Sequence, residues 1–135
     1  MVIDTSALAA IVFGEPEAEY FLDRIAGDPL RLLSAVSRLE TGMIVEARKG
    51  TLAGHEFALL MDRLGITVVP FDQQQSELAL HAWRRYGKGN HPAGLNFGDC
   101  CSYALAKVRC QDLLYKGEDF TRTDLATPPV ARASL

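Results

Sequence analysis

The chain has 135 residues, of which 48% are apolar and 23% are charged, and its net charge is −3. This length predicts one domain with a sizeable core, and this composition is typical of a globular protein rather than a disordered one. The mildly acidic charge gives no reason of its own to expect nucleic-acid binding, although bound cations would reduce the negative charge that a substrate meets.

No segment of the sequence indicates a membrane or an oxidising compartment. The first residues lack the basic region of a signal peptide, and Asp4 interrupts their apolar run. Later apolar runs are too short to span a bilayer. The three cysteines, Cys100, Cys101 and Cys110, form no C-x-x-C pair, which argues against a disulfide framework or a structural zinc site. We therefore expect a cytoplasmic protein with no membrane association.

Short apolar runs alternate with helical patterns in the first half of the chain. The i, i+3, i+4, i+7 spacing of apolar residues indicates helices, and Gly50 and Gly65 follow two of these helices as stop signals. Strands are predicted over residues 1–4 and 30–34, and helices over residues 18–25, 35–49 and 51–64.

The second half continues the alternation. A run rich in β-branched residues predicts a strand over residues 66–71, and Asp72 is suited to cap a helix that extends to Tyr86. Three glycines and a proline make residues 87–97 a loop. A helix is then predicted over residues 98–109 and a strand over 113–115, and the tail with Pro128 and Pro129 could form at most an edge strand.

Strands separated by helices predict an α/β fold. We expect a parallel sheet of about four to five strands sandwiched between helices, in a single domain over residues 1–135. In such sheets ligands bind beyond the carboxyl ends of the strands, near the point where the strand order reverses.

Four acidic residues fall where this fold would bring them together: Asp4, Glu40, Asp99 and Asp119. At 100° per residue, Glu40 lies within the apolar arc of helix 35–49, where a carboxylate is unfavourable unless it is paired, protonated or metal-bound. At about 4 Å and an effective dielectric constant near 20, one pair of like charges costs roughly 4 kcal/mol. A proton or a hard divalent cation would relieve this repulsion, so the cluster indicates metal chemistry.

Each acid also has an ordinary structural interpretation. Asp4 and Asp99 are placed to cap helices, Glu40 could pair with a buried arginine or reach water, and Asp119 could be a solvated turn residue.

The loop over residues 87–97 combines glycines with cations. It follows Arg84 and Arg85 and contains Lys88 and His91. Such a segment could hold a phosphate backbone without reading its sequence, and it could equally be an ordinary surface loop.

These features resemble the PIN-domain ribonucleases, specifically the VapC-type toxins of bacterial toxin–antitoxin pairs. The resemblance covers nearly the whole chain and lies in an ordered set of segments. These segments are residues 2–8, 37–40, 86–89, 95–99 and 116–120, followed by Thr123 and Asp124.

The resemblance implies a PIN-like three-layer α/β/α fold that hydrolyses RNA with Mg²⁺, for which Mn²⁺ could substitute. Asp4 and Asp99 would be the metal ligands, and Glu40 would complete or order the site. Many PIN domains carry an Asp at the position that Gly117 occupies here. Asp119 would then take the fourth catalytic role, with Glu118 and Asp124 as alternatives.

The resemblance further implies an RNA substrate, a VapB-type antitoxin that blocks the acidic cleft, and a homodimer. The sequence does not identify the RNA target, the number of metal ions, the dimer face or the antitoxin. Two other interpretations remain open: a PIN-like domain that binds RNA without cleaving it, and a receiver-like signalling domain phosphorylated at Asp72.

Overall fold

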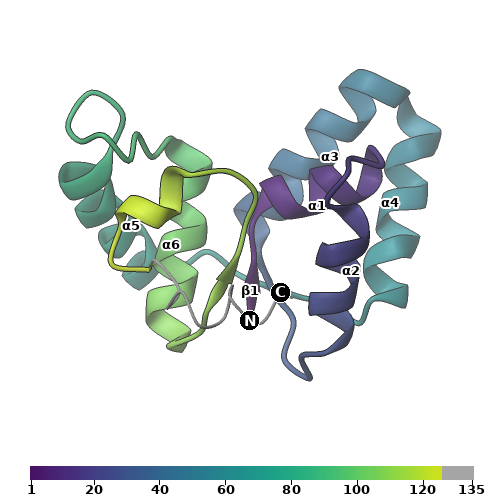
Figure 1. Ribbon diagram of the computed structural model, residues 1–135, viewed down its shortest axis with the longest axis horizontal. Coiled ribbons are helices and arrows are strands. Elements are labelled where there is room, and N and C mark those ends of the chain that lie inside the picture. The colour runs from purple at the N-terminus through teal and green to yellow at the C-terminus, as the bar shows by residue number, and fades with distance from the viewer. Residues whose placement is uncertain (126–135) are drawn as a thin grey trace.

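The computed structural model describes residues 1–125 and places four short parallel strands between two groups of helices (Figure 1). The sheet has the strand order β3-β2-β1-β4. Its strands are β1 (Val2–Ile3), β2 (Leu32–Ser34), β3 (Thr67–Val69) and β4 (Leu113–Leu114). The helices are α1 (Thr5–Val12), α2 (Ala18–Ala26), α3 (Ala35–Lys49), α4 (Thr51–Arg63), α5 (Gln73–Tyr86) and α6 (Phe97–Arg109), followed by the 3-10 helix η1 (Asp119–Arg122).

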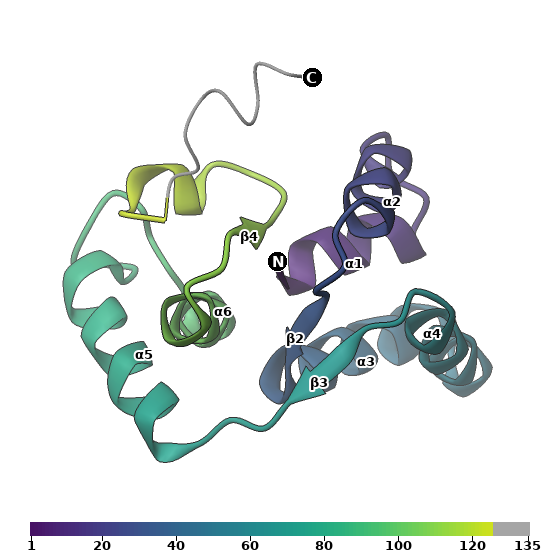
Figure 2. The same ribbon diagram turned by 90° about the horizontal axis from the view of Figure 1, so that it is seen from below.

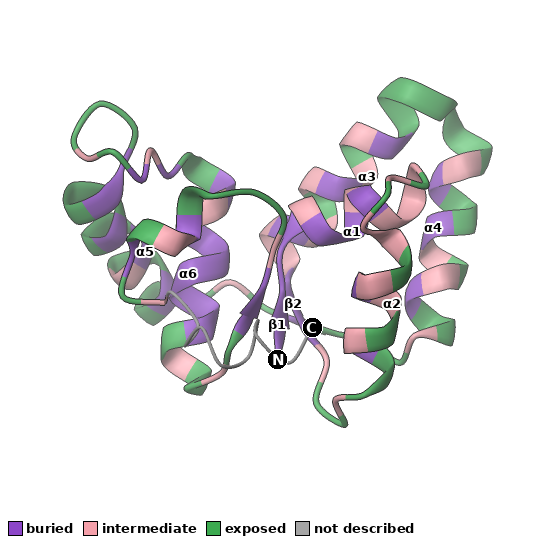
Figure 3. Cartoon of the chain, in the orientation of Figure 1, coloured by how far each residue is buried: buried purple, intermediate pink, exposed green. Residues whose placement is uncertain are grey.

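The two faces of the sheet are covered by different helices, as Figure 2 shows from below. Because successive side chains of a strand point to opposite faces, Val2 and Leu32 pack with α5 and α6, whereas Ile3 and Leu33 pack with α1 to α4. Strands β1, β2 and β4 are buried, whereas Thr67 and Val68 of the edge strand β3 and the outer helix faces are exposed (Figure 3). The predicted three-layer α/β fold is therefore confirmed.

The chain reverses its direction across the sheet next to β1. It passes from β1 to β2 and β3 on one side and then returns to β4 on the other side of β1. The carboxyl ends of β1 and β4 thus lie together at the point where open α/β sheets bind ligands. Asp4 directly follows β1, so this topology places it at that point.

The helix α1 and the helix η1 were not delimited from the sequence. In α1 the run from Ala7 to Val12 is wholly apolar, so it shows no 3.6-residue periodicity that would mark a helix. The strands are shorter than predicted. In particular, β3 ends at Val69, directly before Pro70, which has no N–H to donate to the sheet. The expected edge strand around Pro128 lies outside the described residues.

The prediction that the apolar arc of α3 is buried is wrong. Leu39 and Met43 are each 63% exposed, and the buried face of the helix consists of Ser37, Thr41 and Val45. The reason is that α3 packs closely between α1 and α6, where small side chains fit best. Glu40 is half-buried at the edge of that face rather than at the centre of an apolar one.

Within residues 1–125 no helix is long and apolar enough to cross a membrane. The three cysteines, all of which lie in this range, are free thiols.

Shortening Leu33 tests the core beneath the sheet. Leu33 is fully buried in the middle of β2, so Leu33→Ala should lower the free energy of unfolding in urea by about 2–5 kcal/mol through lost contacts and a cavity. The matched change Leu52→Ala, at an exposed site on α4, should alter it by no more than about 0.5 kcal/mol. Equal losses in the two variants would contradict the packing described here.

Candidate active site

The four acidic residues predicted from the sequence come from four different elements and share one site. Asp4 follows β1, Glu40 lies on α3, Asp99 lies in the first turn of α6, and Asp119 begins η1. Burial and the charges of Asp4, Asp119 and Glu40 together raise the pKa of Asp99 to about 7, against an opposing hydrogen bond from the Asn96 backbone. The convergence expected from the strand order is therefore present.

Asp4 is buried, and hydroxyl groups surround it. Its Oδ2 accepts hydrogen bonds from the backbone N–H of Ser6 at 3.0 Å and from Ser6 Oγ at 2.6 Å, and its Oδ1 accepts one from Ser102 Oγ at 2.6 Å. The bond to the Ser6 N–H caps α1, so the capping interpretation is also correct. Three hydrogen-bond donors to one carboxylate fix its orientation.

Asp99 likewise combines a structural role with a place in the cluster. Its Oδ2 accepts a hydrogen bond from Asn96 N, and Asn96 Oδ1 accepts one from Asp99 N, which together form a capping box at the start of α6. This reciprocal pair fixes the carboxylate against the helix start, where the helix dipole favours negative charge.

Glu40 reaches the cluster because α3 and α6 approach each other closely. A Cβ atom placed on Gly98 would lie 2.5 Å from Oε1 of Glu40, so a larger residue there would displace this carboxylate from its present position. The alternative of a buried arginine partner does not hold, since the guanidinium of Arg38 lies over the ring of Phe57 instead. Within residues 1–125, none of the four acids forms an ion pair.

The alternatives for the fourth acid differ in their surroundings. Asp119 is exposed, and its charge acts on Asp99, whereas Asp124 is engaged by Tyr103 and Lys107. The backbone at Gly117 has φ +98°, a conformation that an aspartate would adopt only with strain. The geometry therefore places Asp119 in the cluster in spite of the glycine two residues earlier.

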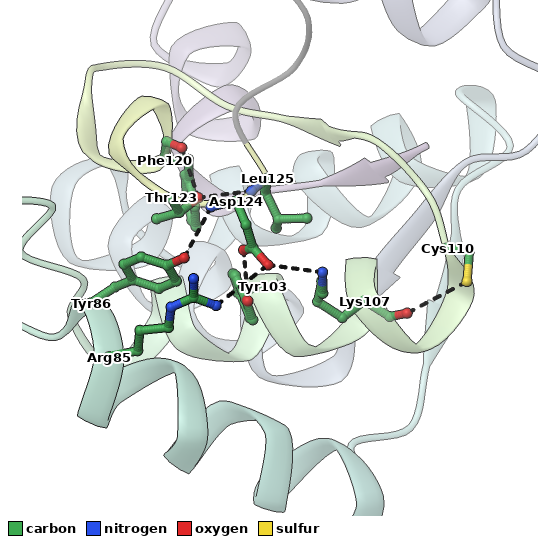
Figure 4. A network of polar contacts seen from close by, with 9 residues as sticks. All are labelled: Arg85, Tyr86, Tyr103, Lys107, Cys110, Phe120, Thr123, Asp124 and Leu125. Carbon is green, nitrogen blue, oxygen red and sulfur yellow. Dashed lines mark hydrogen bonds and ion pairs between the residues drawn. The ribbon is translucent and has the colours of Figure 1, made fainter.

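Asp124 belongs to a different network, which Figure 4 shows. It accepts hydrogen bonds from the Tyr103 hydroxyl at 2.7 Å and from Lys107 Nζ at 3.0 Å. The Nη1 atom of Arg85 lies 3.9 Å from Oδ2 of Asp124 and forms an ion pair with it. Burial acts to raise the pKa of Asp124, but these hydrogen bonds and positive charges outweigh it and leave the pKa lowered. Asp124 thus fastens the segment after η1 to α5 and α6.

The contacts of Ser6 and Ser102 with Asp4 were not predicted from the sequence. Ser6 follows Asp4 by two residues, which is the spacing of a side chain that caps a helix. Ser102 lies three residues after Asp99, one helical turn along the same face of α6, and this spacing could have indicated that it faces the cluster.

The loop over residues 87–97 is held at both ends. Lys88 N donates to Leu95 O at 3.0 Å, and Leu95 N donates to Tyr86 O at 2.9 Å. Arg85 is engaged by Asp124, whereas Arg84 and Lys88 are exposed and make no ion pair with any residue from 1 to 125. Lys88 lines a cavity together with Asn96 and Phe97, so its side chain is available to an anion near the start of α6.

The residues present fit a divalent cation in their chemistry. Within residues 1–125, no group of three or more Asp, Glu, His or Cys side chains is arranged to hold a metal ion by itself. Mg²⁺, however, keeps several waters and is commonly bound by only one or two carboxylates. Oxygen donors, unbalanced negative charge and a carboxylate with a pKa near 7 together match such an ion.

The other candidate chemistries find less support. Burial raises the pKa of Cys100 to about 11, helped by the charge of Asp99, so this thiol stays protonated at neutral pH. Asp72, the alternative phosphoacceptor, accepts a hydrogen bond from Gln75 N at 2.9 Å as the cap of α5. The acidic cluster remains the candidate site.

The raised pKa of Asp99 predicts a specific dependence of stability on pH. An unfolded aspartate titrates near 3.8, so between about pH 4 and 7 the folded chain holds a proton that the unfolded chain has released. In EDTA, the free energy of unfolding of the wild type should therefore fall as the pH rises through this window. Asp99→Asn keeps the capping oxygen and removes the charge, and should reduce this fall by on the order of 1 kcal/mol.

Asp124→Asn is the matched control, because the pKa of Asp124 is shifted in the opposite direction. Asp124 contributes stability that is present above its unfolded pKa and is lost as the pH falls, so its variant should be less stable at pH 8. Urea titrations at pH 5 and pH 8 measure both effects. An Asp99→Asn variant with the wild-type pH dependence would show that the cluster does not strain Asp99.

Comparison with known proteins identifies the family. The PIN domain family model matches residues 1–125. Ribonuclease VapC of Mycolicibacterium smegmatis is 52% identical over 126 residues, which are 93% of this chain and 98% of the relative. Ribonuclease VapC30 of Mycobacterium tuberculosis is 50% identical over 127 residues, with 94% and 97% covered.

Two solved structures share the fold at low sequence identity. One is VapC20 of Mycobacterium tuberculosis, a toxin that cleaves the sarcin–ricin loop, with a TM-score of 0.72 at 20% identity, covering 89% of this chain and 92% of that one. The other is a toxin–antitoxin complex from Klebsiella pneumoniae, with a TM-score of 0.70 at 18% identity and coverage of 95% and 96%. The chain therefore belongs to the PIN-domain family and, within it, to the VapC ribonucleases.

Proposed function

We propose that this chain is the ribonuclease toxin of a VapBC-type toxin–antitoxin pair and that it hydrolyses RNA phosphodiester bonds with Mg²⁺ or Mn²⁺ in the cytoplasm. The observation that carries the metal dependence is the acidic cluster. Four carboxylates interact at one site, and none has a cationic partner among residues 1–125. Such a site is stable at neutral pH only with a proton or a cation in it.

The four acids would have different roles in metal binding, according to their surroundings. Asp4, buried and oriented by its hydroxyl donors, and Asp99, fixed by its capping box, would hold the ion. Glu40 and Asp119, which are less restrained, would complete the site or order its waters. When bound, a divalent cation supplies neutralisation of charge on the phosphate and activation of a water for attack.

The unpaired cations Arg84, at the end of α5, and Lys88, in the loop that follows, would bind the substrate backbone. Arg84 and Lys88 are exposed, and phosphate contacts from such side chains position RNA without reading its sequence. They would also offset the repulsion between a polyanion and an acidic site. The RNA target would then depend on contacts other than these.

An antitoxin would exploit the same imbalance of charge. A basic side chain of a VapB-type partner placed among the four carboxylates would supply the missing positive charge and exclude both metal and substrate. This proposal follows from the VapC family membership and from the unpaired acids of this chain.

A homodimer would cover an apolar surface beside the site. Leu80, Trp83 and Phe97 are exposed around a cavity of roughly 440 Å³ between α5 and the start of α6. Phe97 is 75% exposed at the rim of this cavity, so one face carries both a protruding ring and a recess. A two-fold interface needs such a self-complementary face.

The catalytic proposal predicts that Asp4→Asn and Asp99→Asn each lower RNA cleavage by at least about a hundredfold, because each removes charge that would hold the ion. Excess EDTA should abolish cleavage by the wild type, and Mg²⁺ should restore it. Gel assays on total RNA measure the rates, and circular dichroism verifies that the variants remain folded.

Two further variants test which residue acts as the fourth catalytic acid. Asp119→Asn should lower cleavage, whereas Asp124→Asn should keep it in spite of lower stability, because Asp124 is engaged by Tyr103 and Lys107. The reverse pattern would overturn the assignment of Asp119. Full cleavage by Asp4→Asn, or by the wild type in EDTA, would overturn the metal-dependent mechanism.

The dimer proposal predicts that Trp83→Glu shifts the chain from dimer to monomer in sedimentation velocity, because a charge would be buried in the interface. Leu52→Glu, at an exposed apolar site on α4, serves as the control and should leave the dimer intact. A wild type that sediments as a monomer, or equal dimerisation of both variants, would contradict this face as the interface.

A further inference from the structure

A line of buried hydroxyl groups connects α3 and α6 to Asp4. Ser102 Oγ on α6 donates to Asp4 Oδ1 at 2.6 Å, and Ser37 Oγ on α3 lies 3.1 Å from Ser102 Oγ. Both serines are completely buried. The line therefore joins two neighbouring helices and the end of β1 in the interior, where water does not compete for these hydrogen bonds.

The direction of donation along this line follows from the number of protons. A serine hydroxyl has one proton to donate and two lone pairs to accept. Ser102 donates its one proton to Asp4 Oδ1. Ser37 must then donate to Ser102, and the order is Ser37 to Ser102 to Asp4.

The two serines lie one helical turn from two of the other acids. Ser37 precedes Glu40 by three residues on α3, and Ser102 follows Asp99 by three residues on α6, and residues at this spacing share a helix face. The hydroxyl line thus fixes the separation of the helices that carry Glu40 and Asp99 while it orients Asp4. Gly98 permits the same close approach next to Glu40.

We infer that Ser102, supported by Ser37, is a positioning residue that sets the orientation of Asp4 for binding the divalent ion. This inference rests on the proposed metal-dependent function. Without the Ser102 hydroxyl, Asp4 Oδ1 would be buried without this donor, while Oδ2 stayed bound to Ser6. The carboxylate could then turn about its remaining anchor, and the donor geometry for the ion would be lost.

The test is the affinity of the metal-free protein for Mn²⁺ alone, measured by titration calorimetry, so that no cleavage is needed. Ser102→Ala should weaken Mn²⁺ binding by about ten- to a hundredfold, the range known for residues that orient metal ligands. Ser37→Ala should weaken it less, because Ser102 would still donate to Asp4. Ser102→Thr keeps the hydroxyl and should retain affinity near that of the wild type, even if its extra methyl group lowers stability.

Ser34→Ala separates orientation from stability. Ser34 is also completely buried, but its hydroxyl caps α3 by accepting from Val36 N at 3.2 Å, and within residues 1–125 no hydrogen bond joins it to Asp4. This variant should melt at a lower temperature than the wild type and bind Mn²⁺ equally well. In cleavage assays, Ser102→Ala should raise the Mg²⁺ concentration needed for half-maximal rate and leave the KM for RNA unchanged.

The possible results are distinct. The inference would be supported if the wild type and Ser34→Ala bind Mn²⁺ equally well and Ser102→Ala binds it weakly. Equal binding by Ser102→Ala and the wild type, or equal losses in Ser102→Ala and Ser34→Ala, would overturn it and leave the metal-dependent function intact. A wild type that binds no Mn²⁺ would overturn both.

Discussion

Mutual repulsion between four carboxylates is the constraint on which the candidate site depends. Asp99 shows it most directly, because burial and the charges of Asp4, Asp119 and Glu40 raise its pKa to about 7. No arginine, lysine or histidine among residues 1–125 pairs with these acids. The fold stabilises an arrangement that is electrostatically incomplete, and a VapC ribonuclease would use that incompleteness to bind a cation.

Small side chains and hydrogen bonds hold the carboxylates close together in spite of their repulsion. Gly98 lets the carboxylate of Glu40 lie against α6, and the hydroxyl groups of Ser37 and Ser102 hold α3, α6 and Asp4 together. The reversal of strand order beside β1 brings the ends of β1 and β4 to the same place. Asp124, by contrast, is neutralised by Lys107 and Arg85 and strengthens the fold outside the cluster.

The sequence predicted the fold and the grouping of the acids, because strand–helix alternation and parallel topology determine where the strand ends meet. The sequence-based prediction failed where packing between helices determines which side chains are buried. Leu39 and Met43 form an apolar stripe that is exposed, whereas the buried face of α3 carries Ser37 and Thr41. Glu40 was therefore selected by an argument about burial that is wrong, although Glu40 does lie in the cluster. The support given by Ser102 is a contact across helices, which no local pattern specifies.

The central claim is that a divalent cation occupies the acidic cluster and contacts Asp4 and Asp99. Anomalous diffraction from crystals of the wild type grown with Mn²⁺ tests it most directly, because the peak locates the ion without reference to activity. The account predicts one or more peaks adjacent to the carboxylates of Asp4 and Asp99 that are lost in Asp99→Asn. Well-ordered carboxylates with no peak between them, in a protein that still cleaves RNA, would contradict it.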